Sequence, residues 1–143
     1  MILVDANLLL YAYHPRAEQH ERARAWLEAA LSGPEPVGLP WSTVLAFLRL
    51  ATSPRVFARP LSTAEAEIIV STWLAESSVV LVSPGDRYWE ILRALLIDAQ
   101  VTGPLVTDAA LAALAIEHGA TLATTDRDFA RFRGLRLSDP LQA

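Results

Sequence analysis

The pattern of apolar and polar positions changes its period along the chain. Continuous apolar runs typical of short buried strands occur at 2–4, 37–39, 79–82, 120–125 and 135–137. Between them, apolar residues recur at the three- and four-residue spacing of helices, over about 19–32, 41–52, 63–75, 86–99 and 107–118. Strands that alternate with helices in this way predict one α/β sandwich with a mostly parallel sheet.

Local signals predict where several of these helices begin and end. Gly33 and Pro34 should stop the helix that follows the first strand, and Ser62 or Thr63 should cap the helix at 63–75. Gly119 should close the helix that opens at Thr107 and Asp108. The spacing of Trp89, Leu92 and Leu96 predicts one apolar helix face. No repeat or linker divides the chain, so we expect a single domain over 1–143.

The composition is that of a compact globular protein. Apolar residues make up 52% of the 143 positions, and no uncharged apolar run approaches the roughly 18 residues of a membrane helix. The N-terminus lacks the basic segment of a secretory signal. With no cysteine, the chain has neither a disulfide framework nor a thiolate metal site. These features fit a cytoplasmic protein.

The charge pattern excludes several functional classes. The net charge of −4 argues against a general nucleic-acid-binding protein. All twelve basic residues are arginines. The absence of lysine excludes a P-loop lysine, a Schiff base and a receiver-type aspartate–lysine site. Arginine still offers a planar fork suited to phosphate, and Arg127, Arg55 and Arg59 are candidates for contacts with a phosphate backbone or for ordinary surface residues.

Three aspartates stand at junctions between strands and helices. Asp5 ends the first strand, Asp126 follows the strand at 120–125, and Asp108 opens the helix at 107–118. Taken singly, each is well explained as a helix cap, because aspartate accepts hydrogen bonds from the first amides of a helix. A structural α/β domain whose aspartates only cap helices is therefore one interpretation, and it predicts that the three carboxylates lie far apart.

Taken together, the three aspartates favour a metal site. The carboxyl ends of parallel strands line one crevice, where ligands of open α/β sheets bind. Carboxylates that share a cleft repel each other unless a cation neutralises them. Mg²⁺ prefers oxygen ligands and is usually held by one or two carboxylates, with water and phosphate oxygens completing its shell. Asp5, Asp108 and Asp126 are thus candidate ligands for Mg²⁺ or Mn²⁺, and a phosphodiester is the expected substrate.

Polar residues next to these aspartates are candidates for supporting roles. Asn7, the only asparagine, could orient a carboxylate or a water molecule beside Asp5, or it could be an ordinary first-turn residue. Asp128 could contact the ion through water or carry a first-turn charge of a short helix. Thr124 is either a simple strand residue or a hydrogen-bond donor to the site. The three histidines share no metal-binding spacing, so we interpret them as structural.

The segments "ILVDANLLLYA" and "VTDAALAALAIEHGATLATTDRDFARF" resemble the PIN-domain ribonucleases, specifically the VapC toxins of bacterial type II toxin–antitoxin systems. The resemblance covers nearly the whole chain. It implies a PIN-like three-layer sandwich with helices on both faces of the sheet. It also implies a Mg²⁺- or Mn²⁺-dependent endoribonuclease, often a homodimer, that a cognate antitoxin neutralises. Asp5 and Asp108 become the principal metal ligands, with Asp126 as the third acidic residue and Asp128 nearby.

One departure from the family pattern matters. The family usually carries a glutamate in the helix after the second strand, but "WSTVLAFLRLAT" contains no acid, and Ala46 is the expected equivalent position. The missing carboxylate argues against a complete second metal site. It also motivates an alternative function, a catalytically weak PIN-like domain that binds RNA or protein. Exposure of apolar residues in and after this helix, such as Trp41, Phe47, Val56 or Phe57, would indicate an antitoxin or dimer surface.

Overall fold

The computed structural model describes residues 1–142, so Ala143, the last residue of the expected domain, lies outside the described part. The strands are β1 (Ile2–Val4), β2 (Val37–Pro40), β3 (Val79–Val82), β4 (Thr121–Ala123) and β5 (Arg136–Ser138). The α-helices are α1 (Ala6–Tyr13), α2 (His20–Ser32), α3 (Trp41–Ala51), α4 (Thr63–Ala75), α5 (Tyr88–Asp98) and α6 (Leu105–Glu117). A short 3-10 helix, η1 (Arg127–Arg131), joins β4 to β5.

The strands form one sheet in the order β3-β2-β1-β4-β5, and every neighbouring pair is parallel. The expected parallel α/β sheet is confirmed. From β1 the chain builds outward through β2 to β3, and it then returns to the other side of β1 to form β4. The boundary between β1 and β4 is therefore the topological switch point, and ligands of open α/β sheets bind at the carboxyl ends of the strands there.

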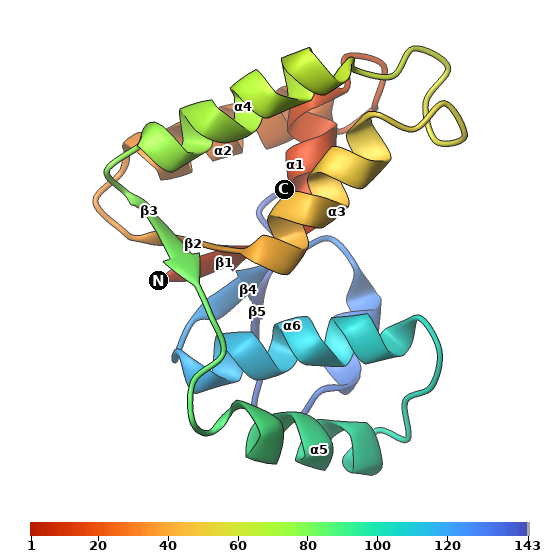
Figure 1. The fold of residues 1–143 in the computed structure, drawn as a ribbon. Helices are drawn as coiled ribbons and strands as arrows, with labels where there is room; N and C mark the ends of the chain where they lie inside the picture. The colour runs from red at the N-terminus through yellow and green to blue at the C-terminus, as the bar shows by residue number, and fades with distance from the viewer. Residues whose placement is uncertain (143) are drawn as a thin grey trace.

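Helices cover both faces of the sheet, with α1 to α4 on one side and α5 and α6 on the other (Figure 1). Side chains of a strand alternate between the two faces, so β1 contributes to both cores. Val4 packs with the helices of the first layer, and the preceding Leu3 packs with α5 and α6. Both residues are fully buried. The short β1 is thus fixed from both sides, which places Asp5 firmly at its carboxyl end.

Several helix ends follow from local sequence. Ser62 caps α4 and forms a capping box with Glu65, in which each side chain bonds the other residue's backbone amide. Gly119 follows α6 with φ of +62°, a conformation that glycine adopts without strain. Within residues 1–142, no helix is long and apolar enough to cross a membrane.

Three details of the sequence prediction are wrong. Helix α6 begins at Leu105, two residues before the predicted start, because Pro104 already has a helical φ of −59°. Trp89 does not share a buried face with Leu92 and Leu96: those leucines pack toward α6, whereas Trp89 is 63% exposed. The strand predicted over 120–125 is shorter, since β4 ends at Ala123 and the following residues turn toward η1.

Candidate active site

Asp5 occupies the N-cap position of α1, but its side chain makes no capping hydrogen bond. Its Oδ2 instead accepts a hydrogen bond of 2.8 Å from the Thr124 hydroxyl, at the end of β4. Its backbone amide donates to the Ala123 carbonyl at 3.0 Å. Asp5 therefore joins the carboxyl ends of β1 and β4, and helix capping alone does not explain the residue.

Thr124 connects Asp5 to the third candidate aspartate. The Thr124 hydroxyl, which donates to Asp5, also accepts a hydrogen bond of 3.0 Å from the backbone amide of Asp126. Asp126 in turn caps η1, because its Oδ1 accepts from the Asp128 amide at 2.9 Å. The prediction that Thr124 could be a hydrogen-bond donor to the site is confirmed. Thr124 is 4% exposed, so the link between Asp5 and Asp126 is held inside the protein.

Asp108 reaches the same edge of the sheet from a different layer. It lies in the first turn of α6, and α6 leads into β4, so its N-terminal end lies at the carboxyl edge of the parallel strands. Burial raises the pKa of the Asp108 carboxyl to about 6, and repulsion from the charges of Asp126, Asp5 and Asp128 adds to the shift. The positive charge of Arg131 lowers it.

Burial also raises the pKa of Asp5, and the charge of Asp126 raises it further. The hydrogen bond from Thr124 and the backbone amides of Ala6 and Asn7 act in the opposite direction, because they favour the ionised form. We call Asp5, Asp108, Asp126 and Asp128 the carboxylate cluster. Its members repel one another, whereas carboxylates serving as isolated helix caps would not.

The donor chemistry of the carboxylate cluster fits a hard divalent cation. Its ligands are oxygens, and the raised pKa values of Asp5 and Asp108 mark charge that a cation would neutralise. In the described part of the chain, no three or more histidine, cysteine, aspartate or glutamate side chains are already placed to hold a metal ion. Mg²⁺ needs only one or two carboxylates, with water completing the shell, so the cluster fits Mg²⁺ but not a closed all-protein cage.

The remaining polar candidates have different positions. Asn7 is half-buried in the first turn of α1, and its backbone amide, not its side chain, favours ionised Asp5. His20 contacts the Tyr11 carbonyl at 2.9 Å, and His118 contacts the Ser83 carbonyl at 2.8 Å. His14 packs against the ring of Phe57, with ring centroids 4.4 Å apart. The histidines thus lie in three separate structural contacts, as expected.

The structure adds Arg131, which sequence reasoning missed. Arg131 is the last residue of η1, and its Nη2 lies 3.5 Å from Oδ1 of Asp128. The three-residue spacing between Asp128 and Arg131 was the available signal, because such pairs face each other on a helical turn. Arg59, by contrast, lies near Pro15, beyond the C-terminal end of α1. The eight residues of α1, about 12 Å at 1.5 Å per residue, separate this region from Asp5.

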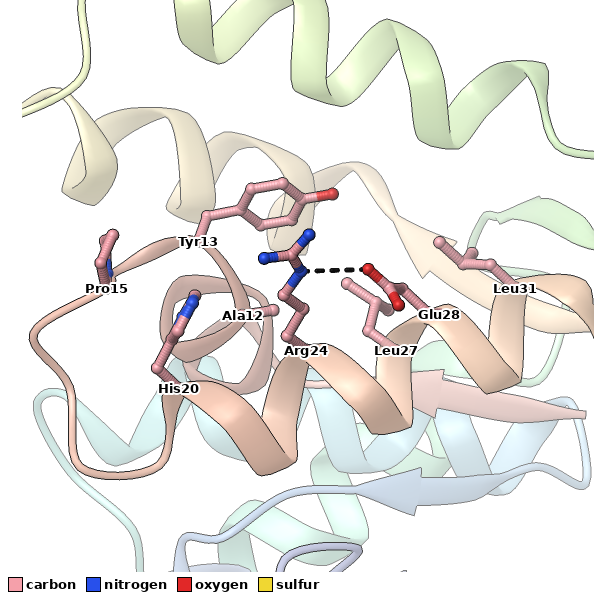
Figure 2. Close-up of a pocket in the computed structure, with 8 residues that line it drawn as sticks. All are labelled: Ala12, Tyr13, Pro15, His20, Arg24, Leu27, Glu28 and Leu31. Atoms are coloured by element: carbon pink, nitrogen blue, oxygen red, sulfur yellow. Dashed lines mark hydrogen bonds and ion pairs between the residues drawn. The ribbon is translucent and has the colours of Figure 1, made fainter.

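A cavity of 410 Å³ lies between α1 and α2, away from the carboxylate cluster (Figure 2). Apolar side chains of both helices form much of its wall, including Tyr13, Leu27 and Leu31. Its charged residues, Arg24 and Glu28, bind each other at 3.0 Å. No aspartate lines this cavity. We call it the α1–α2 cavity, and it lacks the unneutralised charge of the carboxylate cluster.

Comparison with known proteins identifies the family. The family model described as PIN domain matches residues 2–135. The chain belongs to the PIN domain family. Ribonuclease VapC37 of Mycobacterium tuberculosis is 46% identical over 140 residues, which cover 98% of this chain and 97% of that protein. Ribonuclease VapC33 of the same species is 43% identical over 142 residues, 99% of each chain. Both relatives are named as VapC ribonucleases.

Solved structures confirm the PIN-like fold. VapBC2 from Rickettsia felis, bound to a DNA fragment from its promoter, aligns with a TM-score of 0.70 at 17% identity and covers 96% of this chain and 98% of that one. VapC20 of Mycobacterium tuberculosis, described as a toxin that cleaves the sarcin–ricin loop, aligns with a TM-score of 0.67 at 16% identity. It covers 95% of this chain and 99% of that chain. At these identities the likeness concerns the fold.

The helix in which the family resemblance predicts a further glutamate is α3 (Trp41–Ala51). Ala46, at the expected position, is half-buried, and α3 contains no acidic residue. Phe47 is fully buried, whereas Trp41 and, beyond α3, Val56 are each about half exposed. Helix α3 therefore contributes to the core and to an apolar part of the surface, and it adds no acid to the carboxylate cluster.

Proposed function

We propose that this PIN-domain protein is a metal-dependent endoribonuclease and the toxin of a toxin–antitoxin pair. The observation that carries the proposal is the carboxylate cluster at the switch point, where burial and, after it, repulsion between the carboxylates raise the pKa of Asp108 to about 6. The VapC ribonucleases that match over nearly the whole chain support it. We treat residues 1–143 as a single domain.

In this proposal, Asp5, Asp108 and Asp126 are the metal-binding and catalytic residues. A bound Mg²⁺ or Mn²⁺ would activate water as the nucleophile and neutralise charge on the phosphate. Thr124 orients Asp5 by its hydrogen bond to Oδ2 and fixes the Asp126 backbone at the same time. In the proposal, Asn7 and Asp128 would contact the ion through water.

The chain's own residues also support the choice of a hard cation. The amides of Ala6 and Asn7 and the Thr124 hydroxyl favour the ionised form of Asp5, although burial raises its pKa overall. Asp108 is largely ionised above pH 6 and becomes protonated below it. Cation binding should therefore weaken as the pH falls through about 6, because protons compete for the Asp108 carboxylate.

The proposed partners are an RNA substrate, a cognate antitoxin and a second copy of the chain. One structural neighbour is a toxin–antitoxin complex from Klebsiella pneumoniae, with a TM-score of 0.65. Another is VapBC from Salmonella typhimurium bound to DNA. These assemblies support an antitoxin partner, and the half-exposed Trp41 is a candidate contact for the antitoxin or for the second copy. We place the activity in the cytoplasm, where its RNA substrate would be found.

The test is RNA cleavage by the purified protein with Mg²⁺ or Mn²⁺ and with excess EDTA. Cleavage should require the cation, and EDTA should abolish it. Mg²⁺ should also stabilise the folded protein by mass action, by about 2.7 kcal/mol at a hundredfold excess over its dissociation constant. Undiminished cleavage in excess chelator would reject the metal-dependent mechanism.

Asp5→Asn separates the metal-ligand role of Asp5 from a helix-cap role. Asparagine caps helices about as well as aspartate, so a cap would tolerate the change. As a ligand, Asp5→Asn should lose RNA cleavage and much of the stabilisation by Mg²⁺ while remaining folded. An Asn variant that is markedly less stable in EDTA, yet equally responsive to Mg²⁺, would show that Asp5 is structural.

A second candidate function follows from α3, which lacks the family glutamate. A weak or inactive PIN domain could bind RNA or protein without cutting it. The same assay distinguishes the two: this alternative predicts RNA binding with no metal-dependent cleavage, under conditions where Mg²⁺ still raises thermal stability.

A further inference from the structure

Arg131 is fixed beside the carboxylate cluster by two contacts with one residue. Its Nε donates a hydrogen bond of 3.0 Å to the Asp128 carbonyl, and its Nη2 lies 3.5 Å from the Asp128 carboxylate. Within residues 1–142, these are the hydrogen bond and ion pair that the guanidinium makes, so Nη1 keeps its donors available. The side chain is 37% exposed. A group in solution can therefore reach Arg131 while Asp128 holds it in place.

The positive charge of Arg131 lies beside carboxylates that are proposed to bind a cation. Arg131 lies 3.5 Å from the carboxylate of Asp128, whose backbone amide bonds Oδ1 of Asp126, so its positive charge would also oppose a cation held by the neighbouring carboxylates. A phosphodiester is an anion, and a site made only of carboxylates would repel it. A guanidinium at the border of the carboxylate cluster supplies the missing attraction, and its planar fork suits phosphate oxygens.

Other arginines of the chain lack this arrangement. Arg133, two residues further on, is 87% exposed and lies 4.0 Å from Asp98, at the end of α5. Arg136 donates to the Gly119 carbonyl at the end of α6. Arg127 is exposed and makes no hydrogen bond or ion pair with the described residues. Arg131 thus combines contact with the carboxylate cluster, a fixed orientation and exposure.

We infer that Arg131 binds a phosphate oxygen of the RNA at the carboxylate cluster, and that Asp128 positions it for this contact. The inference rests on the proposed ribonuclease function and adds a substrate-binding residue to it. Arg131 would hold the anionic phosphate while Asp5, Asp108 and Asp126 hold the cation. Removing Arg131 should then weaken RNA binding and strengthen cation binding, since the carboxylates lose a competing positive charge.

The test compares Arg131→Gln and Arg131→Lys with the control Arg133→Gln, which removes the same charge from the same segment. Arg131→Gln should lower kcat/KM for RNA cleavage about ten- to a hundredfold, the loss expected for one charge-assisted hydrogen bond. Arg131→Lys should recover part of this loss, because it keeps the charge without the fork. Arg133→Gln should cleave like the wild type.

Two binding measurements distinguish substrate contact from a structural role. Thermal unfolding across a Mg²⁺ titration should show tighter cation binding for Arg131→Gln than for the wild type. RNA binding, measured by fluorescence anisotropy of a labelled single-stranded RNA in an Asp5→Asn background, should show a salt slope reduced by about 0.7, the value for one lost phosphate contact on a single strand.

The inference would be overturned if Arg131→Gln cleaved RNA within twofold of the wild type. It would also be overturned if Arg131→Gln lost cation binding together with cleavage, because Arg131 would then only support the fold of the cluster. A wild type that cleaves no RNA would overturn the proposed function and this inference together. An active wild type with an equally active Arg131→Gln would overturn the inference alone.

Discussion

The carboxylate cluster and the α1–α2 cavity differ in what they offer a ligand. The cavity encloses 410 Å³, but its charges, Arg24 and Glu28, already bind each other. The cluster brings together acids from the end of β1, the first turn of α6 and the start of η1, and the positive charge of Arg131 opposes part of the repulsion at Asp108. The comparison shows that a concave surface alone does not identify a functional site. A better indicator is a group of unneutralised charges at a switch point, because holding such charges together lowers the stability of the folded protein.

The largest expected effect separates these two regions directly. Asp108→Asn should abolish nearly all metal-dependent RNA cleavage, whereas Glu28→Gln, which removes a carboxylate from the wall of the cavity, should leave cleavage unchanged. In EDTA, Asp108→Asn should be as stable as the wild type or more stable, because it removes repulsion from the cluster. RNA cleavage rates and thermal unfolding of both variants check this. Equal losses of activity in both would mean that the comparison between the regions is wrong.

Thr124→Val tests the role of the buried Thr124 hydroxyl, which connects Asp5 to Asp126. Valine has a similar shape but cannot donate to Asp5 or accept from the Asp126 amide. The free energy of unfolding should fall by about 1.5–3 kcal/mol, the range for a hydrogen bond to a charged group, and cleavage should fall with it. Thr124→Ser keeps the hydroxyl and should recover most of both losses. Denaturant unfolding and cleavage assays measure the two effects. A Thr124→Val variant with wild-type stability and cleavage would show that Thr124 has no role in the site.

The pH dependence of the free energy of unfolding should reveal the burial and repulsion of the Asp108 carboxylate. An unfolded aspartate titrates near 3.8, whereas Asp108 in the folded protein titrates near 6. Between these values the folded protein holds a proton that the unfolded chain releases, so stability falls as the pH rises through this window and the full penalty is present above about pH 6. Lowering the pH from 7.5 to 5 in EDTA should therefore raise the melting temperature of the wild type relative to Asp108→Asn.

Saturating Mg²⁺ should reduce this pH-dependent difference in melting temperature between the wild type and Asp108→Asn, because the cation neutralises the Asp108 carboxylate. Thermal unfolding at several pH values, with and without Mg²⁺, gives the comparison. Identical pH profiles for the wild type and Asp108→Asn in EDTA would show that repulsion at Asp108 does not affect folding.

The smallest expected effect concerns α3. Ala46→Glu should preserve or modestly raise Mn²⁺-supported cleavage, because it restores an acid at the position expected for the family glutamate. Burying part of a new carboxylate opposes this gain. Cleavage measured against Mn²⁺ concentration checks the prediction, with Ala46→Gln as the uncharged control. A folded Glu variant without activity would show that Ala46 does not face the carboxylate cluster.

The local pattern determined the class of the fold and the candidates for the site. The apolar runs identified the strands, because a strand covered on both faces must be apolar along its length. Ser62 and Gly119 marked helix ends through hydrogen bonds and backbone conformations that a few neighbouring residues decide. Asp5, Asp108 and Asp126 were visible as acids at the junctions of these elements.

Only the tertiary structure decided what those residues touch. Asp5 and Thr124 are 119 positions apart in the chain, and the spacing that predicts a cap at Asp5 cannot reveal that its carboxylate bonds Thr124 instead. Trp89 fits an apolar helix face, yet its side chain is 63% exposed. The importance of Arg131 depends on Asp108, which lies 23 positions earlier in the chain, on α6. Local signals depend on neighbours in sequence, whereas burial and electrostatics depend on which distant segments the sheet order brings together.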